Sequence, residues 1–330
     1  MRPLTYTRAT DVGDALALVA GSPASAFLAG GTTEVDLIRA GISPSEHLVD
    51  INDLPLADVA DADDGGLRIG ALARMSDVAR SPGVVQRYPA IARALLLSAS
   101  EQLRNMASLG GNLCQRTRCL YLRDGISACN KRDPGSGCAA LDGFNRGHAV
   151  LGTSEHCIAT HPSDVAVALV AFDAVVRILG PEGARSLPVD DFFLLPGDTP
   201  QREHPIGHGE LLVAIDVPGA PIARGSVYLK LRDRQSYEFA LVSVAAALSV
   251  QDGVVADVRL ALGGVGTKPW RARRAEALLV GGPPDEASFR RAAAAELEDA
   301  VVREHNRFKV ELAQRAVVRA LTQSLEGRQP

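Results

Sequence analysis

All five cysteines of this 330-residue chain lie between positions 114 and 157. That segment is largely polar, rich in Gly and Arg, and has neither helical nor strand periodicity. A stretch of that length without secondary structure is uncommon inside a compact domain, so we expect an additional interaction to order it. A chain of this size can bury a good core and does not need disulfides for stability. The cysteine segment therefore calls for a chemical explanation, and metal ligation is a natural one.

Four of the cysteines have the spacing C-x9-C-x8-C-x18-C, and Cys114 lies just upstream of them; the four are Cys119, Cys129, Cys138 and Cys157. Four thiolates can hold either an iron–sulfur cluster or a structural zinc ion. Zinc sites usually contain a close C-x2-4-C pair, which the four lack, although Cys114 and Cys119 would make one. The spacing alone does not decide between iron–sulfur and zinc. Disulfides are a third alternative, disfavoured in a chain without a secretory signal.

Arginines gather around the cysteines: Arg116, Arg118, Arg123, Arg132 and Arg146. They are either solvated loop charges, or they offset a negative thiolate–metal centre or face an acidic partner. The formal net charge of −4, with no long Lys/Arg run, gives no electrostatic footprint for nucleic acid.

The N-terminus has no charged region followed by a continuous apolar region, and no apolar run approaches the roughly 20 residues that span a bilayer. We therefore expect no membrane insertion. By its own sequence the protein is expected in the cytoplasm, and in the periplasm if it is exported on a partner's signal.

Hydrophobic patterning predicts a small β-α-β-α-β unit through about residue 52, whose first helix is capped by Thr10 or Asp11. The pattern next predicts a strand and a helix capped near Ser76, and then a helix over 88–100. It also predicts a helix followed by a strand over 164–180. Turn residues at 218–221 mark a domain boundary. Strands and Ala-rich helices follow it, and YEFALVSVAAALSV is ambiguous between helix and strand.

Three short motifs contain residues suited to binding a ligand. In Leu28-Ala-Gly-Gly-Thr-Thr-Glu34, adjacent glycines allow close backbone approach and the threonines offer hydroxyls, which suits a phosphate or pyrophosphate. Ser108-Leu-Gly-Gly-Asn-Leu113 has a similar Gly-Gly pair, and Thr160-His-Pro-Ser-Asp164 opens a helix. Taken singly, the first two are explained by tight turns, and the third by helix capping through Ser163 or Asp164. No G-x-G-x-x-G or Walker A motif occurs.

In this order the three motifs resemble the flavin-binding medium subunit of the xanthine dehydrogenase and aldehyde oxidoreductase family of molybdenum hydroxylases. The similarity runs nearly end to end and includes DFFLLPG, YLKLRDRQSYEFALVSVAAAL and LALGGVGTKPWRA. Around the cysteines, QRTRCLYLRDG, ACNKRDPGSGCAA and NRGHAVLG resemble the branch of bacterial aldehyde oxidoreductases whose flavin subunit carries a 4Fe–4S cluster in an inserted loop. The β subunit of 4-hydroxybenzoyl-CoA reductase is a relative.

The resemblance implies an α+β protein with a vanillyl-alcohol-oxidase-type (PCMH-type) FAD-binding fold. Two α/β subdomains enclose the flavin, and an α+β domain follows. We expect FAD-binding subdomain 1 over 1–55, subdomain 2 over 56–217 with the iron–sulfur loop at 114–157, and the C-terminal domain over 222–330.

The same resemblance implies the residues that bind the cofactors. The FAD pyrophosphate is expected at Leu28, Ala29, Gly30, Gly31, Thr32, Thr33, Glu34 and Val35. The flavin and its ribityl chain are expected near Ser98, Ala99, Ser108, Gly111, Asn112, Cys114, Ser163 and Asp164. Leu195 is expected against the isoalloxazine. Lys230 is expected near it, where a cation stabilises anionic reduced flavin. Because Cys114 falls on the flavin side, Cys119, Cys129, Cys138 and Cys157 remain as the ligands of the 4Fe–4S cluster.

The function implied is that of an electron-transfer subunit. A molybdopterin-containing large subunit oxidises the substrate, a small subunit with two 2Fe–2S clusters relays the electrons, and this chain passes them from FAD to an external acceptor. We expect no general acid or base here. The 4Fe–4S cluster either extends the relay or mainly orders its loop. The alternatives are a 4-hydroxybenzoyl-CoA reductase-like β subunit, a standalone flavin oxidoreductase and a zinc-stabilised assembly protein.

Overall fold

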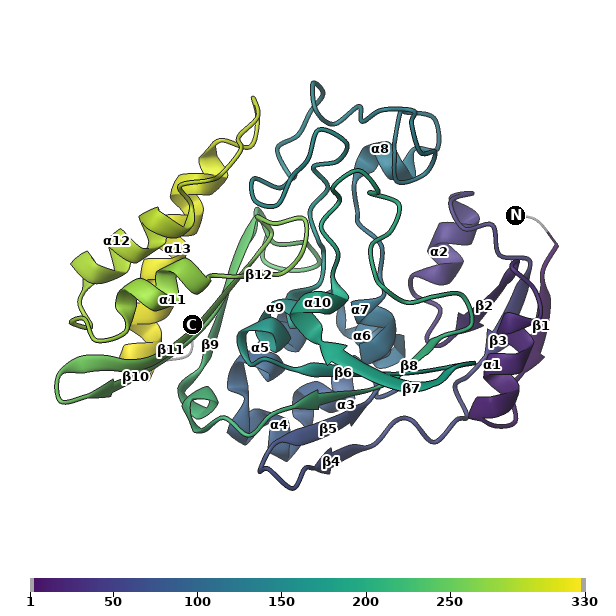
Figure 1. The fold of residues 1–330 in the computed structure, drawn as a ribbon, viewed down its shortest axis with the longest axis horizontal. Coiled ribbons are helices and arrows are strands. Elements are labelled where there is room, and N and C mark those ends of the chain that lie inside the picture. The colour runs from purple at the N-terminus through teal and green to yellow at the C-terminus, as the bar shows by residue number, and fades with distance from the viewer. Residues whose placement is uncertain (1–2, 328–330) are drawn as a thin grey trace.

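The computed structural model describes residues 3–327, which form three sheets arranged side by side (Figure 1). The N-terminal sheet has the parallel order β1 (Thr5–Arg8), β3 (His47–Asp50), β2 (Ser25–Leu28). Helices α1 (Val12–Ala20) and α2 (Glu34–Arg39) connect its strands. This confirms the predicted β-α-β-α-β unit, whose parallel strands require such crossover connections.

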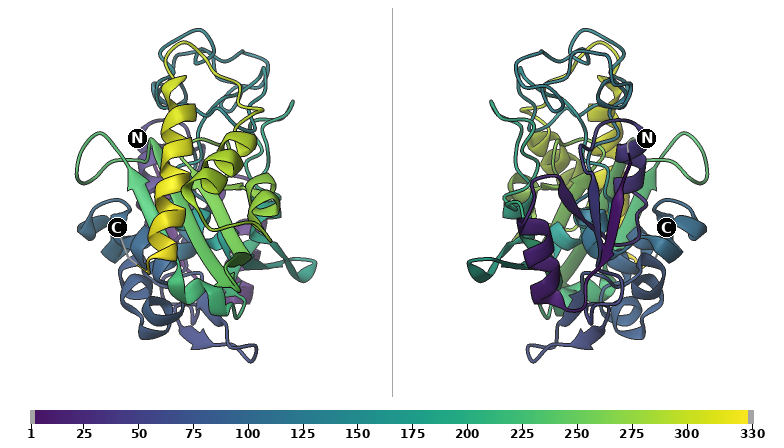
Figure 2. Two further views of the ribbon diagram at one scale, coloured as in Figure 1. Left: turned by 90° about the vertical axis from the view of Figure 1, so that its left-hand side faces the viewer. Right: turned by 90° about the vertical axis from the view of Figure 1, so that its right-hand side faces the viewer.

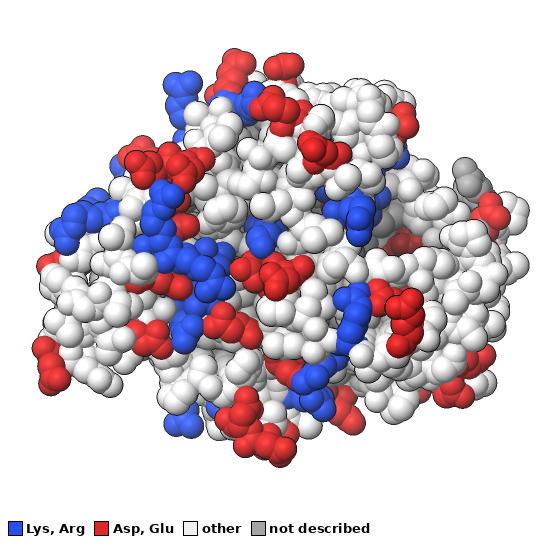
Figure 3. All heavy atoms as spheres, in the orientation of Figure 1, with Lys and Arg blue, Asp and Glu red and all other residues white. Residues whose placement is uncertain are grey.

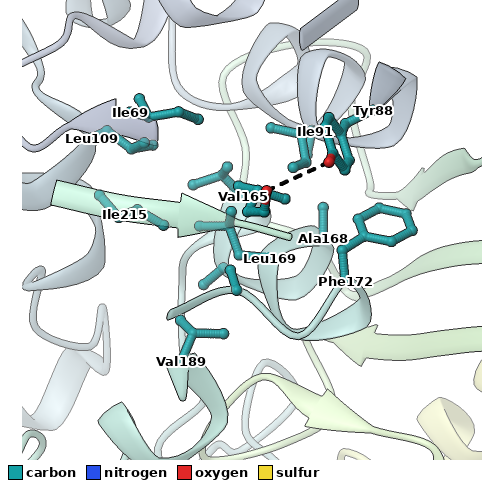
Figure 4. Packing of buried hydrophobic residues seen from close by; sticks show 14 of the residues in the cluster. Ile69, Tyr88, Ile91, Leu109, Val165, Ala168, Leu169, Phe172, Val189 and Ile215 are labelled. Atoms are coloured by element: carbon teal, nitrogen blue, oxygen red, sulfur yellow. Dashed lines mark hydrogen bonds between the residues drawn. The ribbon is translucent and has the colours of Figure 1, made fainter. Parts of the chain in front are cut away.

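The central sheet is antiparallel, with the order β4 (Val59–Asp61), β5 (Leu67–Gly70), β8 (Leu211–Val217), β6 (Val175–Gly180), β7 (Gly183–Pro188). Its helices are α3 (Met75–Arg80), α4 (Pro82–Arg87), α5 (Pro89–Leu97), α6 (Glu101–Met106), α7 (Leu109–Leu113), α9 (Asp164–Ala171) and α10 (Val189–Phe192). Every residue of α9 is buried. Figure 4 shows Val165, Ala168 and Leu169 of α9 among side chains from α5 and the sheet, with Tyr88 donating to the carbonyl of Val217.

The C-terminal sheet has the antiparallel order β12 (Trp270–Arg271), β11 (Val254–Gly263), β10 (Val242–Gln251), β9 (Val227–Leu231). A short 3-10 helix, η1 (Pro221–Gly225), precedes it, and α11 (Arg273–Leu279), α12 (Glu286–Glu296) and α13 (Phe308–Leu325) follow. The ambiguous segment is strand β10. Its alternate residues face two cores: Ala245 and Ala247 pack with α9, whereas Val244 and Ala246 pack with α13. Because both faces are buried, the strand lacks the polar–apolar alternation that identifies strands.

Helix caps agree with the sequence in part. Asp11, rather than Thr10, caps α1 by accepting from the backbone N–H of Asp14 at 2.9 Å. The predicted cap near Ser76 is wrong, since α3 begins at Met75 and Ser76 is buried inside it. Ser163 caps α9 by accepting from the N–H of Ala166 at 3.1 Å. This arrangement leaves the carboxylate of Asp164 available for other contacts.

The cysteine segment, residues 114–157, forms a lobe above the sheets and contains one short helix after Cys114, α8 (Leu120–Arg123) (Figures 1 and 2). Its arginines are not free loop charges. Arg118 and Arg123 pair with Asp36, Arg116 with Glu203 and Arg146 with Asp233, while Arg132 donates to the carbonyls of Tyr121 and Leu122. These contacts attach the lobe to α2, to the loop before β8 and to the loop after β9.

Over the described residues, none of the helices is long and apolar enough to cross a membrane. On the face drawn in Figure 3, acidic and basic side chains are interspersed rather than gathered by sign.

Candidate functional site

The turn between β2 and α2 forms one wall of a cleft of about 570 Å³, which we call the N-terminal cleft. Its floor and far wall come from the start of α7 and from the loop before β8. Its lining includes Ala29, Gly30, Gly31, Thr32, Thr33, Glu34, Ser108, Gly111, Cys114, Arg116, Glu203 and Leu211. Backbone amides and hydroxyls thus line the end near the turn, whereas apolar side chains line much of the rest.

The glycines of this turn are required by close packing. A Cβ atom on Gly30 would lie 1.9 Å from the carbonyl oxygen of Met106, the last residue of α6. Gly31 has a φ of +72°, in the left-handed region that side chains other than glycine rarely adopt. The backbone of the turn is therefore held directly against the end of α6, which fixes this wall of the cleft.

A second cleft, of about 540 Å³, shares Thr32, Thr33 and Gly111 with the first, and we call it the middle cleft. Its other lining residues include Ser98, Ala99, Asn112, Gln115, Asp164, Tyr237 and Phe239. Ala99 has a φ of +47°, a strained conformation for a residue with a Cβ atom. Such strain persists only where surrounding contacts impose it, and it is concentrated at functional sites.

Asp164 is the most heavily bonded side chain on this wall. One carboxylate oxygen accepts from the hydroxyl of Tyr228 at 2.8 Å. The other accepts from the ammonium of Lys230 at 2.7 Å and from the hydroxyl of Ser98 at 3.1 Å. The Lys230 side chain is 1% exposed and that of Asp164 6%. The two charges therefore form a buried ion pair, and Tyr228 and Ser98 add two further hydrogen bonds to the carboxylate.

A third cleft, of about 370 Å³, begins on the other side of Asp164, and we call it the outer cleft. Ser163 and Asp164 line it together with residues of the cysteine segment and of the loop after β9, including Arg118, Cys119, Phe144, His148 and Phe239. The hydroxyl of Ser163 donates to the side-chain oxygen of Asn112 at 2.5 Å, which joins the THPSD and SLGGNL motifs. The three motifs predicted from sequence thus meet around one set of connected clefts.

Cys119, Cys129, Cys138 and Cys157 line one narrow cavity, the cysteine cavity, inside the lobe. Most of its other walls are apolar, formed by Leu122, Ala128, Ala140 and Ala159 among others. Burial raises the pKa of Cys119 to about 12 and that of Cys157 to about 11. Within residues 3–327, no three His, Cys, Asp or Glu side chains are grouped closely enough to hold a single metal ion. Cys114 lies apart and lines the N-terminal cleft.

Two titratable side chains, those of Glu203 and His148, lie where the clefts meet the cysteine segment. Burial disfavours the charge of Glu203, but Lys131 and Arg116 outweigh it and lower the pKa of Glu203 to about 2. Burial, with Lys309 nearby, lowers the pKa of His148 to about 4, so its imidazole is neutral at pH 7. Lys309 is fully buried and donates to the carbonyls of Gly147 and Gly264 at 2.9 and 2.7 Å.

Most of the predicted site residues line these clefts, but four do not. Leu28 ends β2, Val35 is 40% exposed on α2, and Leu195 is 49% exposed in the loop after α10. Lys230 reaches the clefts only through Asp164. Sequence reasoning missed Arg202, Glu203 and His204 in the N-terminal cleft, and Tyr237 in the middle cleft. Tyr237 lies within YLKLRDRQSYEFALVSVAAAL, whereas the place of Glu203 depends on its ion pairs with Arg116 and Lys131 of the distant cysteine segment.

The two larger clefts fit an FAD molecule by their chemistry. FAD combines an anionic pyrophosphate, a hydroxylated ribityl chain and a flat apolar ring system. The glycine turn with Thr32 and Thr33 offers close backbone approach for the first, and Asn112, Ser98 and Asp164 offer polar partners for the second. Cofactor sites are mainly apolar with a few placed polar groups, which describes these walls.

Comparison with known proteins agrees with this assignment. Residues 2–220 match the family model described as the FAD binding domain in molybdopterin dehydrogenase, and residues 227–324 match the CO dehydrogenase flavoprotein C-terminal domain. The chain belongs to this flavoprotein family. It is thus an FAD-binding subunit of the aldehyde oxidoreductase and xanthine dehydrogenase type of oxidoreductase.

Three relatives illustrate the range of the family. The aldehyde oxidoreductase FAD-binding subunit PaoB of Escherichia coli strain K12 is 50% identical over 280 residues, which are 84% of this chain and 86% of PaoB. The glyceraldehyde dehydrogenase medium chain of Sulfolobus acidocaldarius is 27% identical over 84% of this chain and 81% of its own length. A solved carbon monoxide dehydrogenase from Hydrogenophaga pseudoflava superposes with a TM-score of 0.77 at 26% identity, covering 99% of both chains. These matches confirm the predicted fold, in which an FAD-binding part precedes an α+β C-terminal domain.

Proposed function

We propose that this chain is the FAD- and 4Fe–4S-containing electron-transfer subunit of a molybdenum hydroxylase that oxidises aldehydes. One observation carries the proposal. The four cysteines with the C-x9-C-x8-C-x18-C spacing line a single cavity. One of them, Cys119, also lines the outer cleft. The outer cleft adjoins the middle cleft, because Asp164 lines both. A four-thiolate centre in that cavity lies beside the clefts that suit the flavin.

The surroundings of the thiols suit a cluster of thiolate ligands. Backbone N–H groups of Tyr121 and Leu122 donate to the sulfur of Cys119, and that of Ala159 donates to Cys157 at 3.4 Å. Hydrogen bonds to sulfur stabilise the thiolate form that binds iron. Lys131 lines the same cavity and adds a positive charge near Cys157. The donor set contains four cysteines and no carboxylate, which is typical of iron–sulfur ligation.

The proposed flow of electrons begins outside this chain. Oxidation of one aldehyde at the molybdenum of a large subunit releases two electrons. A small subunit with two 2Fe–2S clusters carries them to the FAD of this chain, which passes both to an external acceptor. Bound FAD supplies the two-electron carrier, and the residues described here bind and orient it. The carboxylate of Asp164 is paired with Lys230 and is not a free base.

Within this proposal, the turn of Ala29–Glu34 binds the FAD pyrophosphate. Ser98, Ala99, Ser108, Gly111, Asn112, Cys114, Ser163 and Asp164 surround the ribityl chain and the ring. Leu28 and Val35 support the turn from either end, and Leu195 of the loop after α10 lies against the isoalloxazine. Lys230 acts on the flavin through Asp164, because its ammonium donates to that carboxylate and to the carbonyl of Leu97 at 3.1 Å.

The test is a visible spectrum of the purified complex together with iron, sulfide, zinc and molybdenum analysis. We expect flavin bands and about four cluster irons on this chain in addition to the irons of the small subunit. Cys138→Ser is expected to lower the iron content by that amount, whereas the matched variant Cys114→Ser keeps it. About one zinc per chain with no such iron would overturn the cluster assignment.

Co-purification tests the assignment as a subunit. Recovery of the chain with a molybdenum-containing subunit and a 2Fe–2S subunit, and reduction of its flavin by an aldehyde in that complex, is the expected result. A monomeric chain whose own flavin is reduced by substrate would identify a standalone flavin oxidoreductase. Oxidation of the chemically reduced complex by a hydroxyaryl-CoA thioester, with no reduction of its flavin by aldehydes, would indicate a 4-hydroxybenzoyl-CoA reductase-like complex.

A further inference from the structure

His148 is the side chain in contact with the sulfur of Cys119. Its Nε2 atom lies 3.2 Å from the Sγ atom, and the residue is 8% exposed. Its other ring nitrogen, Nδ1, is buried and has no hydrogen-bond partner among the described residues. The imidazole is held in place by its surroundings, with the ring of Tyr121 at a centroid distance of 6.1 Å and the backbone N–H of His148 donating to Asn145 at 2.9 Å.

The direction of the hydrogen bond follows from the chemistry of the two groups. A cysteine bound to iron is a thiolate, which accepts hydrogen bonds and cannot donate them. When the cluster is present, the Nε2 atom must therefore carry the ring hydrogen and donate a hydrogen bond to Sγ. This tautomer leaves Nδ1 as an acceptor without a donor, in agreement with the absence of a partner for that atom over residues 3–327.

The position of this pair is distinctive among the four ligands. Cys119 and His148 both line the outer cleft, which extends to Ser163 and Asp164. Cys129, Cys138 and Cys157 line the cysteine cavity but not the outer cleft. Cys157 lines a further small pocket with Gln115 and Glu203, which line the middle and N-terminal clefts, so what sets Cys119 apart is its place on the outer cleft.

We propose that His148 sets the reduction potential of the 4Fe–4S cluster by donating a hydrogen bond to Cys119, the ligand that lines the outer cleft. This inference rests on the proposed function, because it requires the cluster. One-electron reduction adds a negative charge to the cluster and its thiolates. An N–H donor to sulfur stabilises that extra charge and raises the potential. His148 is a positioning and tuning residue rather than a ligand, so the cluster should assemble without it.

The experiment is a redox titration of the purified complex, in which the cluster is followed by electron paramagnetic resonance and iron is measured on the same samples. We expect His148→Phe to keep the wild-type iron content and to lower the cluster potential. The expected size is about tenfold in the ratio of reduced to oxidised cluster at a fixed potential, which corresponds to about 59 mV for one electron. His148→Gln retains an N–H donor and is expected to restore at least half of that shift.

The matched control is His305→Phe. His305 packs against Phe144 at a centroid distance of 5.1 Å and lines neither the outer cleft nor the cysteine cavity. The variant His305→Phe also replaces an imidazole by a phenyl ring beside the cysteine lobe. It is expected to leave the cluster potential unchanged.

The outcomes separate the two proposals. Wild-type complex without the extra irons overturns the proposed function itself. Wild-type iron in His148→Phe with an unchanged potential overturns the tuning role alone, as does an equal shift in His305→Phe. If His148→Phe loses its iron, His148→Gln decides. An iron content and a cluster potential near the wild-type values in His148→Gln support the hydrogen bond. Loss of iron from that variant, or a lowered cluster potential in it, overturns the proposal.

Discussion

At the scale of single residues, Asp164 holds the site together. It is the first residue of α9, yet it contacts Ser98 from the end of α5 and both Tyr228 and Lys230 from β9. One carboxylate therefore joins the central and C-terminal sheets at the wall of the middle and outer clefts. Replacing it should affect both the stability of the chain and the binding of FAD.

The variant Asp164→Asn keeps the shape of the side chain and removes its charge. Lys230 would then be a buried cation without a counter-charge, which we expect to lower the free energy of unfolding by about 3 kcal/mol. Urea unfolding followed by circular dichroism measures the loss, and flavin content measures binding. Glu286→Gln makes the same chemical change in an exposed pair with Arg290, where about 0.5 kcal/mol or less is expected. Equal effects of the two changes would contradict the role given to Asp164.

Glu203 gives a prediction about pH. Its pKa in the folded chain is about 2, below the ordinary value of 4.5, because Lys131 and Arg116 outweigh the effect of burial. The stabilisation it provides is complete above pH 4.5 and is lost as the pH falls toward 2. We expect Glu203→Gln to be less stable than the wild type by about 3 kcal/mol at pH 7, on a scale of about 1.4 kcal/mol per pKa unit.

The check is the difference in unfolding free energy between the two proteins from pH 7 to pH 3. That difference should shrink below pH 4.5, since the carboxylate then takes up a proton in the unfolded wild-type chain but stays charged in the folded chain until the pH nears 2. A difference that stays constant over the whole range would show that charge is not the source of the effect.

The sequence predicted part of this residue-level picture. The order of the glycine turns and of Thr160–Asp164 predicted an FAD-binding subunit, which the family comparison confirms, while the individual site residues remain predictions. The partners of Asp164 and Glu203 were not predictable in the same way. Tyr228 and Lys131 lie far from them in sequence, and no local pattern encodes such contacts. For the same reason Lys230, expected beside the flavin, is placed behind Asp164.

At the scale of elements, the turn between β2 and α2 depends on its contact with α6. This contact explains why a glycine is needed at position 30, which the motif alone left open between a tight turn and a binding loop. Elsewhere, element prediction failed where burial hid the pattern. Strand β10 is covered on both faces, and the cysteine segment has no repeating pattern for a helix or a strand to follow.

We expect Gly30→Ala to weaken FAD binding by at least about tenfold, or about 1.4 kcal/mol. The added Cβ atom would meet the backbone of Met106, which cannot move aside as a flexible side chain would. The ratio of flavin to protein absorbance after gel filtration is the measurement. Gly225→Ala is the control, because a Cβ atom there meets nothing within 4 Å. Full flavin content in Gly30→Ala would show that the turn is not part of the binding site.

At the scale of the whole molecule, the cysteine lobe touches the parts of the chain that carry all three sheets. Its arginines pair with Asp36 on α2, Glu203 before β8 and Asp233 after β9. Lys309 of α13 adds hydrogen bonds to the lobe and to the end of the C-terminal sheet. The domain limits predicted at 55 and 217 remain predictions.

These attachments predict a dependence of the whole chain on the proposed cluster. Removing iron with a chelator under reducing conditions should raise the rate of limited proteolysis in the loops after α2, before β8 and after β9 as well as in the lobe, by about tenfold or more. Mass spectrometry of the early fragments locates the cuts. Cleavage confined to residues 114–157 would contradict the dependence.

The carboxylates that bind the lobe line the clefts proposed for FAD and the outer cleft beside them, so FAD and the proposed cluster need not be inserted independently. In a newly made chain with an unfilled lobe, the cleft entrance would be loosened and would not retain FAD. Filling the lobe would close that entrance around the bound FAD. The order in which a cell delivers iron and flavin would then decide how much finished protein it obtains. Iron shortage would be felt first as flavin missing from a protein whose flavin supply is ample.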